Sequence, residues 1–157
     1  MPERAQLEPL TTLDRVLEFA SHHPILVLAL VSVFALFLFT EFRRLSRPYR
    51  EVEPGQATRL INDGAVVVDV RQPDVFKRGH IAGAANYPAD RFDAFEDELN
   101  KRLKQAKTQM VLLYCEMGMT SARTATQLAK KQAELDVVHL KGGITAWQRE
   151  NLPLRKG

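Results

Sequence analysis

The chain contains 157 residues, with 22 Lys and Arg against 19 Asp and Glu, so its formal charge is +3. A single cysteine excludes an internal disulfide and a cysteine-based metal site, and the four histidines do not cluster in the sequence. We therefore expect no metal and no cofactor. The length indicates one domain of ordinary size plus a further segment.

The stretch from residue 19 to residue 40 has no Lys, Arg, Asp or Glu and is apolar on almost every face of a helix. A helix over it would measure roughly 33 Å, which exceeds the ~30 Å hydrocarbon core of a bilayer. We predict a transmembrane helix at residues 19–42, because the rest of the chain is too small to enclose such a helix. A cleaved signal peptide is the alternative, but bulky and basic residues stand where a small-residue cleavage site would be needed.

The two flanks of this stretch differ in charge. Residues 1–18 hold two arginines among four acidic residues, whereas four arginines follow the stretch: Arg43, Arg44, Arg47 and Arg50. The positive-inside rule makes residues 1–18 a short extracytoplasmic N-terminus and places the C-terminal part in the cytoplasm. We expect residues 43–50 to form a basic juxtamembrane tether. Its arginines either bind anionic lipid headgroups or act only as a stop-transfer signal.

Residues 51–157 have the pattern of a soluble α/β domain. Apolar, β-branched runs predict strands at residues 65–70, 85–88, 110–114 and 137–140. Helical patterns lie between them, at residues 53–61, 73–78, 90–104, 121–132 and 144–150. This alternation predicts a central parallel sheet of four or five strands with helices on both faces.

The only cysteine, Cys115, stands where the predicted strand 110–114 ends and a loop leads to the next helix. In α/β proteins this is where helix N-termini and their free backbone N–H groups meet. Such groups stabilise a thiolate and increase its reactivity at neutral pH. The alternative is that Cys115 is a small buried hydrophobic residue, as many lone cysteines are.

Four motifs occur in order along residues 51–153. They are Val68-Asp69-Val70-Arg71, Gly79-His80-Ile81-Ala82-Gly83-Ala84, Cys115-Glu116-Met117-Gly118-Met119-Thr120-Ser121 and Leu140-Lys141-Gly142-Gly143-Ile144-Thr145-Ala146-Trp147. Together they resemble the rhodanese (sulfurtransferase) family. With the apolar helix in front, the whole chain resembles the single-domain rhodaneses anchored in the bacterial inner membrane.

The resemblance implies a persulfide mechanism and assigns roles to particular residues. Cys115 would take up a sulfane sulfur and pass it to a thiol or to cyanide. The active-site loop that would cradle the sulfur consists of Glu116, Met117, Gly118, Met119, Thr120 and Ser121. Ser121 stands where a helix N-cap is expected. Asp69 and Arg71 match the pair that supports this loop in the family.

The loop also departs from the family pattern, because Glu116 and Thr120 replace two arginines that are common there. Thiosulfate is a dianion, so losing two cations and gaining a carboxylate predicts poor use of thiosulfate. Arg123 and Lys141 are possible substitute cations, or ordinary solvated surface charges. Asp74 is a possible partner for Arg71, because Val75 stands where the family often has an acidic residue.

We therefore predict a membrane-anchored sulfurtransferase with a sulfur donor and a thiol acceptor, either of them small or protein-bound. The alternative is a catalytically weak or inactive interaction module that recruits membrane or cytoplasmic partners. Met117 and Met119 suit an apolar contact with a partner, or pack inward. A phosphatase is disfavoured because Thr120 and Ser121 stand where phosphate transfer needs an arginine. Nothing in the sequence points to nucleic-acid binding, and the oligomeric state stays open.

Overall fold

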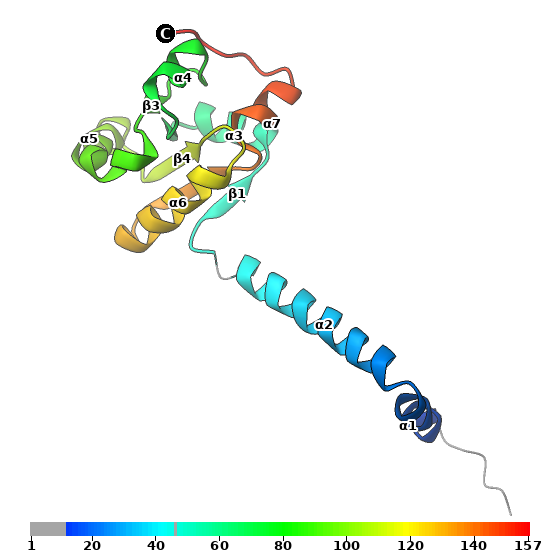
Figure 1. The fold of residues 1–157 in the computed structure, drawn as a ribbon. Coiled ribbons are helices and arrows are strands. Elements are labelled where there is room, and N and C mark those ends of the chain that lie inside the picture. The colour runs from blue at the N-terminus through cyan, green and yellow to red at the C-terminus, as the bar shows by residue number, and fades with distance from the viewer. Residues whose placement is uncertain (1–11, 46) are drawn as a thin grey trace, which may run out of the picture. The chain divides into compact units, whose positions relative to one another are not determined.

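The computed structural model describes residues 12–45 and 47–157, with the side chains of residues 13 and 43–45 left aside (Figure 1). It consists of two compact units, Met1–Ser46 and Arg47–Gly157.

The described part of the N-terminal unit contains two helices, α1 (Thr12–His22) and α2 (Pro24–Leu45). The prediction had one uninterrupted helix over residues 19–42, but the structure interrupts it at His23. Pro24 explains the break, since proline has no N–H to donate to the preceding turn and disfavours helical backbone in the residue before it. Proline is well suited to the first position of the new helix. Of the predicted extracytoplasmic segment, residues 1–18, residues 12–18 belong to α1 and residues 1–11 lie outside the described residues.

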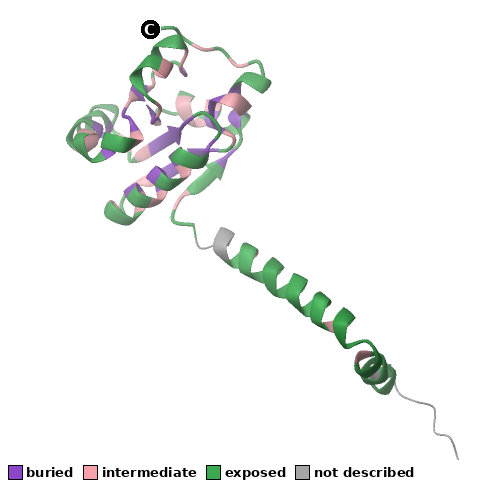
Figure 2. Ribbon diagram, in the orientation of Figure 1, coloured by how far each residue is buried: buried purple, intermediate pink, exposed green. Residues whose placement is uncertain are grey.

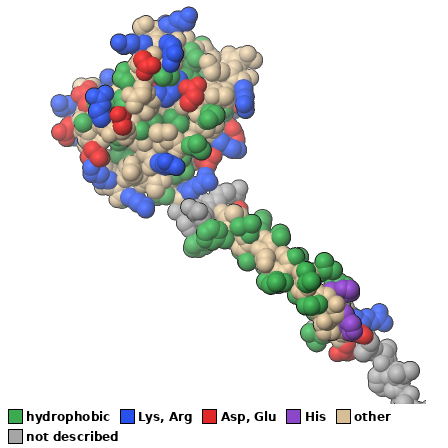
Figure 3. All heavy atoms as spheres, viewed as in Figure 1, with side chains coloured by type: hydrophobic (Ala, Val, Ile, Leu, Met, Phe, Trp, Pro, Cys, Tyr) green, Lys and Arg blue, Asp and Glu red, His purple; other side chains and the backbone are tan. Residues whose placement is uncertain are grey.

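Helix α2 is apolar over most of its length. Residues Pro24–Phe42 have a mean hydropathy of 2.5, and none of this stretch is buried inside the structure. Hydrophobic side chains cover the face of α2 that Figure 3 shows. By length and composition, α2 is one helix able to cross a membrane. The kind of membrane and the orientation stay predictions.

The C-terminal unit is an α/β domain, as the alternation of patterns predicted. In chain order its elements are β1 (Arg50–Val52), α3 (Pro54–Asn62), β2 (Val66–Asp69), α4 (Pro73–Arg78), β3 (Ala85–Asn86), the 3-10 helix η1 (Ala89–Phe95), α5 (Glu96–Ala106), β4 (Met110–Tyr114), α6 (Met119–Lys131), β5 (Asp136–Leu140) and α7 (Gly143–Arg149). The five strands form one parallel sheet in the order β1-β5-β4-β2-β3. Strand β4 is central, so the residue that follows it lies in the middle of one sheet edge.

Two hydrophobic cores cover the two faces of this sheet, and β4 contributes to both. Val111 and Leu113 pack in one core with residues of α5 and α6, while Leu112 and Tyr114 pack in the other with residues of α3 and α7. This alternation follows from the two-residue period of a strand. The buried residues drawn purple in Figure 2 follow the strands and the inner faces of the helices.

The predicted tether at residues 43–50 is not one separate segment in the structure. Helix α2 continues to Leu45, and Arg50 already begins β1, which pairs with β5. Arg47 forms an ion pair with Glu51, and the Nε group of Arg50 donates to Asp136 Oδ1 at 2.9 Å. These two arginines are thus ion-paired within the domain. The side chains of Arg43 and Arg44 lie outside the described part, so their contact with lipid stays a prediction.

Two helical segments differ from the prediction by more than one residue or in helix type. The predicted helix at residues 90–104 is a 3-10 helix followed by α5, with non-helical backbone at Arg91 (φ −130°, ψ 21°). Helix α6 begins at Met119, two residues before the predicted start, because Gly118 ends the loop in a left-handed conformation with φ +96°.

Candidate active site

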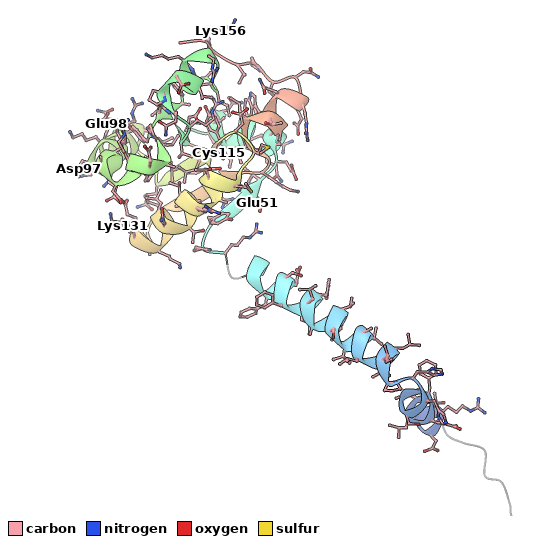
Figure 4. All side chains as sticks on the ribbon, in the orientation of Figure 1. Glu51, Asp97, Glu98, Cys115, Lys131 and Lys156 are labelled. Atoms are coloured by element: carbon pink, nitrogen blue, oxygen red, sulfur yellow. The ribbon has the colours of Figure 1, made fainter. Side chains whose placement is uncertain are left out.

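Cys115 directly follows β4 and is 5% exposed (Figure 4). Its sulfur accepts a hydrogen bond from the Gly118 backbone N–H at 3.2 Å and another from the Ser121 N–H at 3.4 Å. The Ser121 hydroxyl lies 3.4 Å from the same sulfur and can donate to it. Donors converging on one sulfur stabilise a thiolate or a persulfide anion there.

Ser121 reaches the sulfur from inside α6. It was predicted to be the N-cap, but the N-cap is Gly118 and Ser121 is the third residue of the helix. Its hydroxyl also lies 3.2 Å from the Gly118 carbonyl oxygen. Because a hydroxyl carries one hydrogen, Ser121 donates either to this carbonyl or to Cys115. It can therefore shift toward the sulfur as negative charge develops.

His139, on β5, supports the active-site loop. It was not recognised in the sequence as a site residue. Its Nε2 group donates to the Gly118 carbonyl oxygen at 2.9 Å, and the residue is 4% exposed. Burial lowers the pKa of His139 below its ordinary value, so the ring is neutral at pH 7. The only sign of its role in the sequence is that it is a polar residue within the apolar run 137–140. Periodicity alone does not show that this residue contacts the loop.

The first turn of α7 holds the start of the loop. Ile144 N–H donates to the Cys115 carbonyl at 2.9 Å, and Thr145 N–H donates to the Glu116 carbonyl at 3.1 Å. The Thr145 hydroxyl adds a 2.9 Å bond to the same Glu116 carbonyl. Gly143 makes this approach possible, since a Cβ on it would lie 2.4 Å from the Cys115 carbonyl oxygen. A glycine at position 143 is therefore a requirement of the loop.

Asp69 and Arg71 lie at the end of β2, beside β4. The Arg71 Nε donates to both Asp69 carboxylate oxygens at 3.0 Å, and its NH2 group donates to Oδ2 at 2.7 Å. NH2 also donates to the Gly79 carbonyl at 2.7 Å. Burial works against the charge of Arg71, but its hydrogen bonds to Asp69 and Glu116 raise its pKa above the ordinary value. Through these hydrogen bonds the Asp69–Arg71 pair connects the end of β2 to the turn at Gly79.

Glu116 is the third partner of Arg71. The NH1 group donates to Glu116 Oε2 at 2.9 Å, although the Glu116 side chain is 57% exposed. Asp74, the predicted substitute partner, instead lies 3.6 Å from Arg78 in an exposed pair. The family pattern places a carboxylate near Val75. In this chain the carboxylate that contacts Arg71 comes instead from Glu116 of the active-site loop.

A pocket of about 380 Å³ opens beside Cys115, and we call it the cysteine pocket. It is lined by Val70, Arg71, Gln72, Ala89, Asp90, Cys115, Glu116, Met117, Met119 and Thr120. Arg71 is the only Lys or Arg among these lining residues, against the two carboxylates of Asp90 and Glu116. The side chains that line the cysteine pocket therefore carry more negative than positive charge.

The methionines of the loop face outward, with Met117 65% and Met119 69% exposed. Neither predicted substitute cation lines the cysteine pocket. Lys141 Nζ lies 2.6 Å from Glu53, and Arg123 is exposed on α6. The structure thus brings Asp69, Arg71 and the loop together with Cys115, and it leaves Arg123 and Lys141 outside the cysteine pocket.

The sequence profile of the rhodanese-like domain matches residues 53–150 of this chain. The chain belongs to the rhodanese family. It is 37% identical over 147 residues to the uncharacterised protein YibN of Escherichia coli K12, a match that covers 92% of this chain and 99% of YibN. It is 30% identical to the thiosulfate sulfurtransferase GlpE of Actinobacillus pleuropneumoniae serotype 7, over 70% of this chain and 96% of GlpE.

Solved rhodanese structures share the fold. A rhodanese-related protein from Thermoplasma volcanium superposes with a TM-score of 0.53 and 27% identity, over 69% of this chain and all of that protein. A thiosulfate sulfurtransferase from Pseudomonas aeruginosa gives a TM-score of 0.59 at 19% identity, over 76% of this chain and 22% of that one, and shows the fold alone. At the level of the family, the rhodanese assignment supports sulfurtransferase-type chemistry.

Proposed function

We propose that this rhodanese is a sulfurtransferase that carries sulfane sulfur as a persulfide on Cys115. The observation that supports this most directly is the position of the Cys115 sulfur, which has two backbone N–H donors at 3.2 and 3.4 Å and a hydroxyl at 3.4 Å. These donors belong to the backbone and to a buried serine, so they need little reorganisation when charge develops on the sulfur. The arrangement suits a group that alternates between a thiolate and a persulfide.

The reaction has two displacement steps on the sulfane sulfur. The Cys115 thiolate attacks the outer sulfur of a donor persulfide, the donor sulfur–sulfur bond breaks, and the donor leaves as a thiolate. In the second step an acceptor thiolate or cyanide attacks the outer sulfur of Cys115–S–SH. Cys115 then leaves as the thiolate, held again by Gly118 and Ser121. No external oxidant or reductant is consumed.

Thiosulfate is expected to be a poor donor for this protein. The dianion would enter a pocket whose lining carries one positive and two negative side chains. The one positive group, Arg71, already donates from NH1 to Glu116 and from NH2 to Asp69 and Gly79. A neutral or protein-bound persulfide avoids this repulsion. The exposed Met117 and Met119 offer an adaptable apolar contact for a protein donor.

We further propose that α2 anchors the protein in the bacterial inner membrane, with the rhodanese domain in the cytoplasm. The apolar stretch Pro24–Phe42 and the four arginines at positions 43, 44, 47 and 50 support this orientation. The anchor would keep the sulfur carrier beside membrane-bound donors or acceptors.

The test is intact mass spectrometry of the full-length protein in detergent. It is incubated separately with thiosulfate and with a neutral alkyl persulfide, and Cys115→Ser is the control. We expect one added sulfur atom on the wild type with the persulfide, less with thiosulfate, none on Cys115→Ser, and discharge by cyanide or a thiol. A folded wild type that gains no sulfur from either donor would overturn the proposal and favour the interaction module.

A further inference from the structure

The first residues of the C-terminal unit pack against β5, and we call residues 47–51 the entry segment. The entry segment follows α2 in the sequence and leads into β1, which pairs with β5 so that Glu51 lies opposite His139. Tyr49 is half-buried and packs against the hydrophobic core that contains Cys115. The chain therefore enters the domain beside the strand that supports the active-site loop.

The side chains of Tyr49 and His139 make an aromatic contact. Their ring centroids are 5.6 Å apart and the ring planes meet at 74°, which is an edge-to-face arrangement that aromatic pairs favour. The guanidinium carbon of Arg47 lies 6.0 Å from the centroid of the Tyr49 ring, and Arg47 also forms an ion pair with Glu51. Tyr49 thus contacts both Arg47 and His139, and these two neighbours restrict the position of its ring.

Only one ring nitrogen of His139 is hydrogen-bonded to a described residue. Nε2 donates to the Gly118 carbonyl oxygen at 2.9 Å, so this nitrogen carries the hydrogen of the neutral ring. Nδ1 is buried and has no hydrogen-bond partner among the described residues. The orientation of a histidine ring is usually fixed by the hydrogen bond that its second nitrogen makes. At His139 this task is left to packing, and the structure supplies the edge-to-face contact with Tyr49.

Gly118 connects His139 to the sulfur of Cys115. The Gly118 carbonyl oxygen accepts from His139, and the Gly118 N–H donates to the sulfur at 3.2 Å. A Cβ on Gly118 would lie 3.3 Å from His139 Nε2, so the ring and this residue are in direct contact. A change in the position of the His139 ring would therefore move Gly118, and with it one of the donors that hold the sulfur.

Phe95 shows what a purely structural aromatic residue of this core looks like. Like Tyr49, it is half-buried and packs against the core that contains Cys115. Its ring stacks on that of Tyr87 with centroids 4.9 Å apart, and it does not line the cysteine pocket. Of these two half-buried aromatic residues, Tyr49 is the one that contacts the histidine holding the active-site loop.

We propose that Tyr49 is a positioning residue for the sulfur site, and that the entry segment supports the Cys115 loop through His139. Tyr49 fixes the His139 ring, the ring fixes Gly118, and the Gly118 N–H stabilises negative charge on the sulfur. The inference deepens the proposed function and rests on it, because the same sulfur carries the persulfide. The segment that joins α2 to the domain is therefore part of the support of the site as well as a link in the chain.

The test measures the ratio of thiolate to thiol at Cys115 by ultraviolet absorbance of the full-length protein in detergent at pH 7. Each variant is compared with the same variant carrying Cys115→Ser, and since Cys115 is the only cysteine, the difference belongs to this sulfur. In Tyr49→Leu we expect the ratio to fall about fivefold, which corresponds to the net strength of one hydrogen bond. The rate of sulfur loading should fall in parallel. Tyr49→Phe keeps the ring and should keep the wild-type ratio.

Two further variants separate positioning from packing. Phe95→Leu is the matched control, and it should lower the thermal stability as Tyr49→Leu does but leave the thiolate ratio unchanged. His139→Leu cannot donate to Gly118, so adding Tyr49→Leu to it should cause no further decrease. An unchanged ratio in Tyr49→Leu, an equal decrease in Phe95→Leu, or additive decreases in the double variant would overturn the proposal. If the wild type takes up no sulfur while Tyr49→Leu still lowers the ratio, the positioning role stands and the proposed reaction fails.

Discussion

Arg71 and Glu116, 45 positions apart in the sequence, are joined by a 2.9 Å hydrogen bond from the NH1 group to the carboxylate. Glu116 immediately follows the candidate nucleophile, whereas Arg71 lies at the end of the neighbouring strand β2. The side chain of Arg71 is 8% exposed and that of Glu116 is 57% exposed, so the exposed partner covers the buried one. An anion approaching Cys115 therefore meets Glu116 before it can reach the guanidinium.

Replacing Glu116 tests this relationship. In Glu116→Gln the cysteine pocket loses one negative charge and Arg71 loses an ionic partner, so thiosulfate should be used better. Because Glu116 is half exposed and screened by water, we expect a gain of about 3- to 30-fold in kcat/KM for thiosulfate. The rate with a neutral persulfide should change little. Glu98→Gln on α5 is the matched surface control, and an unchanged or lower thiosulfate rate in Glu116→Gln would contradict the prediction.

The buried pair of Asp69 and Arg71 predicts a stability effect. Asp69 is fully buried, and Arg71 compensates its charge with three side-chain hydrogen bonds. Arg71→Met should therefore cost about 3–5 kcal/mol, because an uncompensated carboxylate is left inside. The double variant Asp69→Asn/Arg71→Met should recover part of this loss. Thermal unfolding of the full-length variants in detergent measures both, and a double variant no more stable than Arg71→Met would refute the explanation.

Two glycines with similar backbone but different surroundings give a paired test. Gly83 has φ +78° with open space around it, whereas Gly143 has φ +60° and a Cβ there would lie 2.4 Å from the Cys115 carbonyl oxygen. Gly83→Ala should cost only the left-handed strain, about 1–2 kcal/mol. Gly143→Ala should cost more and also reduce sulfur loading, because the loop must move. Equal losses of stability with normal loading would show that α7 does not position the loop.

His139 predicts a dependence of stability on acid pH. Burial lowers its pKa in the folded protein below the ordinary value of 6.5. At a pH between the pKa of His139 in the folded protein and its pKa in the unfolded chain, the unfolded chain binds more protons than the folded protein. The free energy of unfolding therefore falls as the pH falls below 6.5, and above 6.5 this group does not affect it. The negative charge of Glu51 raises the pKa of His139, and the positive charge of Arg47 lowers it.

Unfolding of wild type and His139→Gln at pH 7.5 and 5.5 isolates this contribution from that of the carboxylates. The amide of glutamine can still donate to the Gly118 carbonyl, so the loop keeps one of its supports. The variant should lose less stability than the wild type on acidification. An equal loss in both proteins would remove His139 as the cause.

The sequence predicted what depends on local pattern. The β-branched run of β2 and the apolar run of β4 located two central strands, and the motif order located Cys115, Gly118 and the Asp69–Arg71 pair. Strand β1 was missed because Arg50-Glu51-Val52 contains one apolar residue and is ordered by pairing with β5 and by the Arg50–Asp136 contact. Local pattern carries no information on such a partner.

The same reason explains why two contacts at the site were not predicted. The contact of Glu116 with Arg71 exists because β2 and β4 are neighbours in the sheet, and the support from His139 exists because β5 is the other neighbour of β4. Residue type offered Arg123 and Lys141 either as substitute cations or as solvated charges, and Asp74 as a possible partner for Arg71. Asp74 and Arg123 are exposed on helices and Lys141 is exposed in the turn after β5, where sequence patterns cannot separate a solvated charge from a functional one.

Trp147 is the only tryptophan of the chain and is buried in α7. The N–H groups that begin this helix donate to the carbonyls of Cys115 and Glu116, and the Trp147 indole donates to the Pro153 carbonyl of the C-terminal segment. The protein therefore carries a single tryptophan, and it lies in the helix that holds the reactive loop. Sulfur loading of Cys115 can therefore be followed through tryptophan emission in the unlabelled protein, without attaching a dye near the one cysteine.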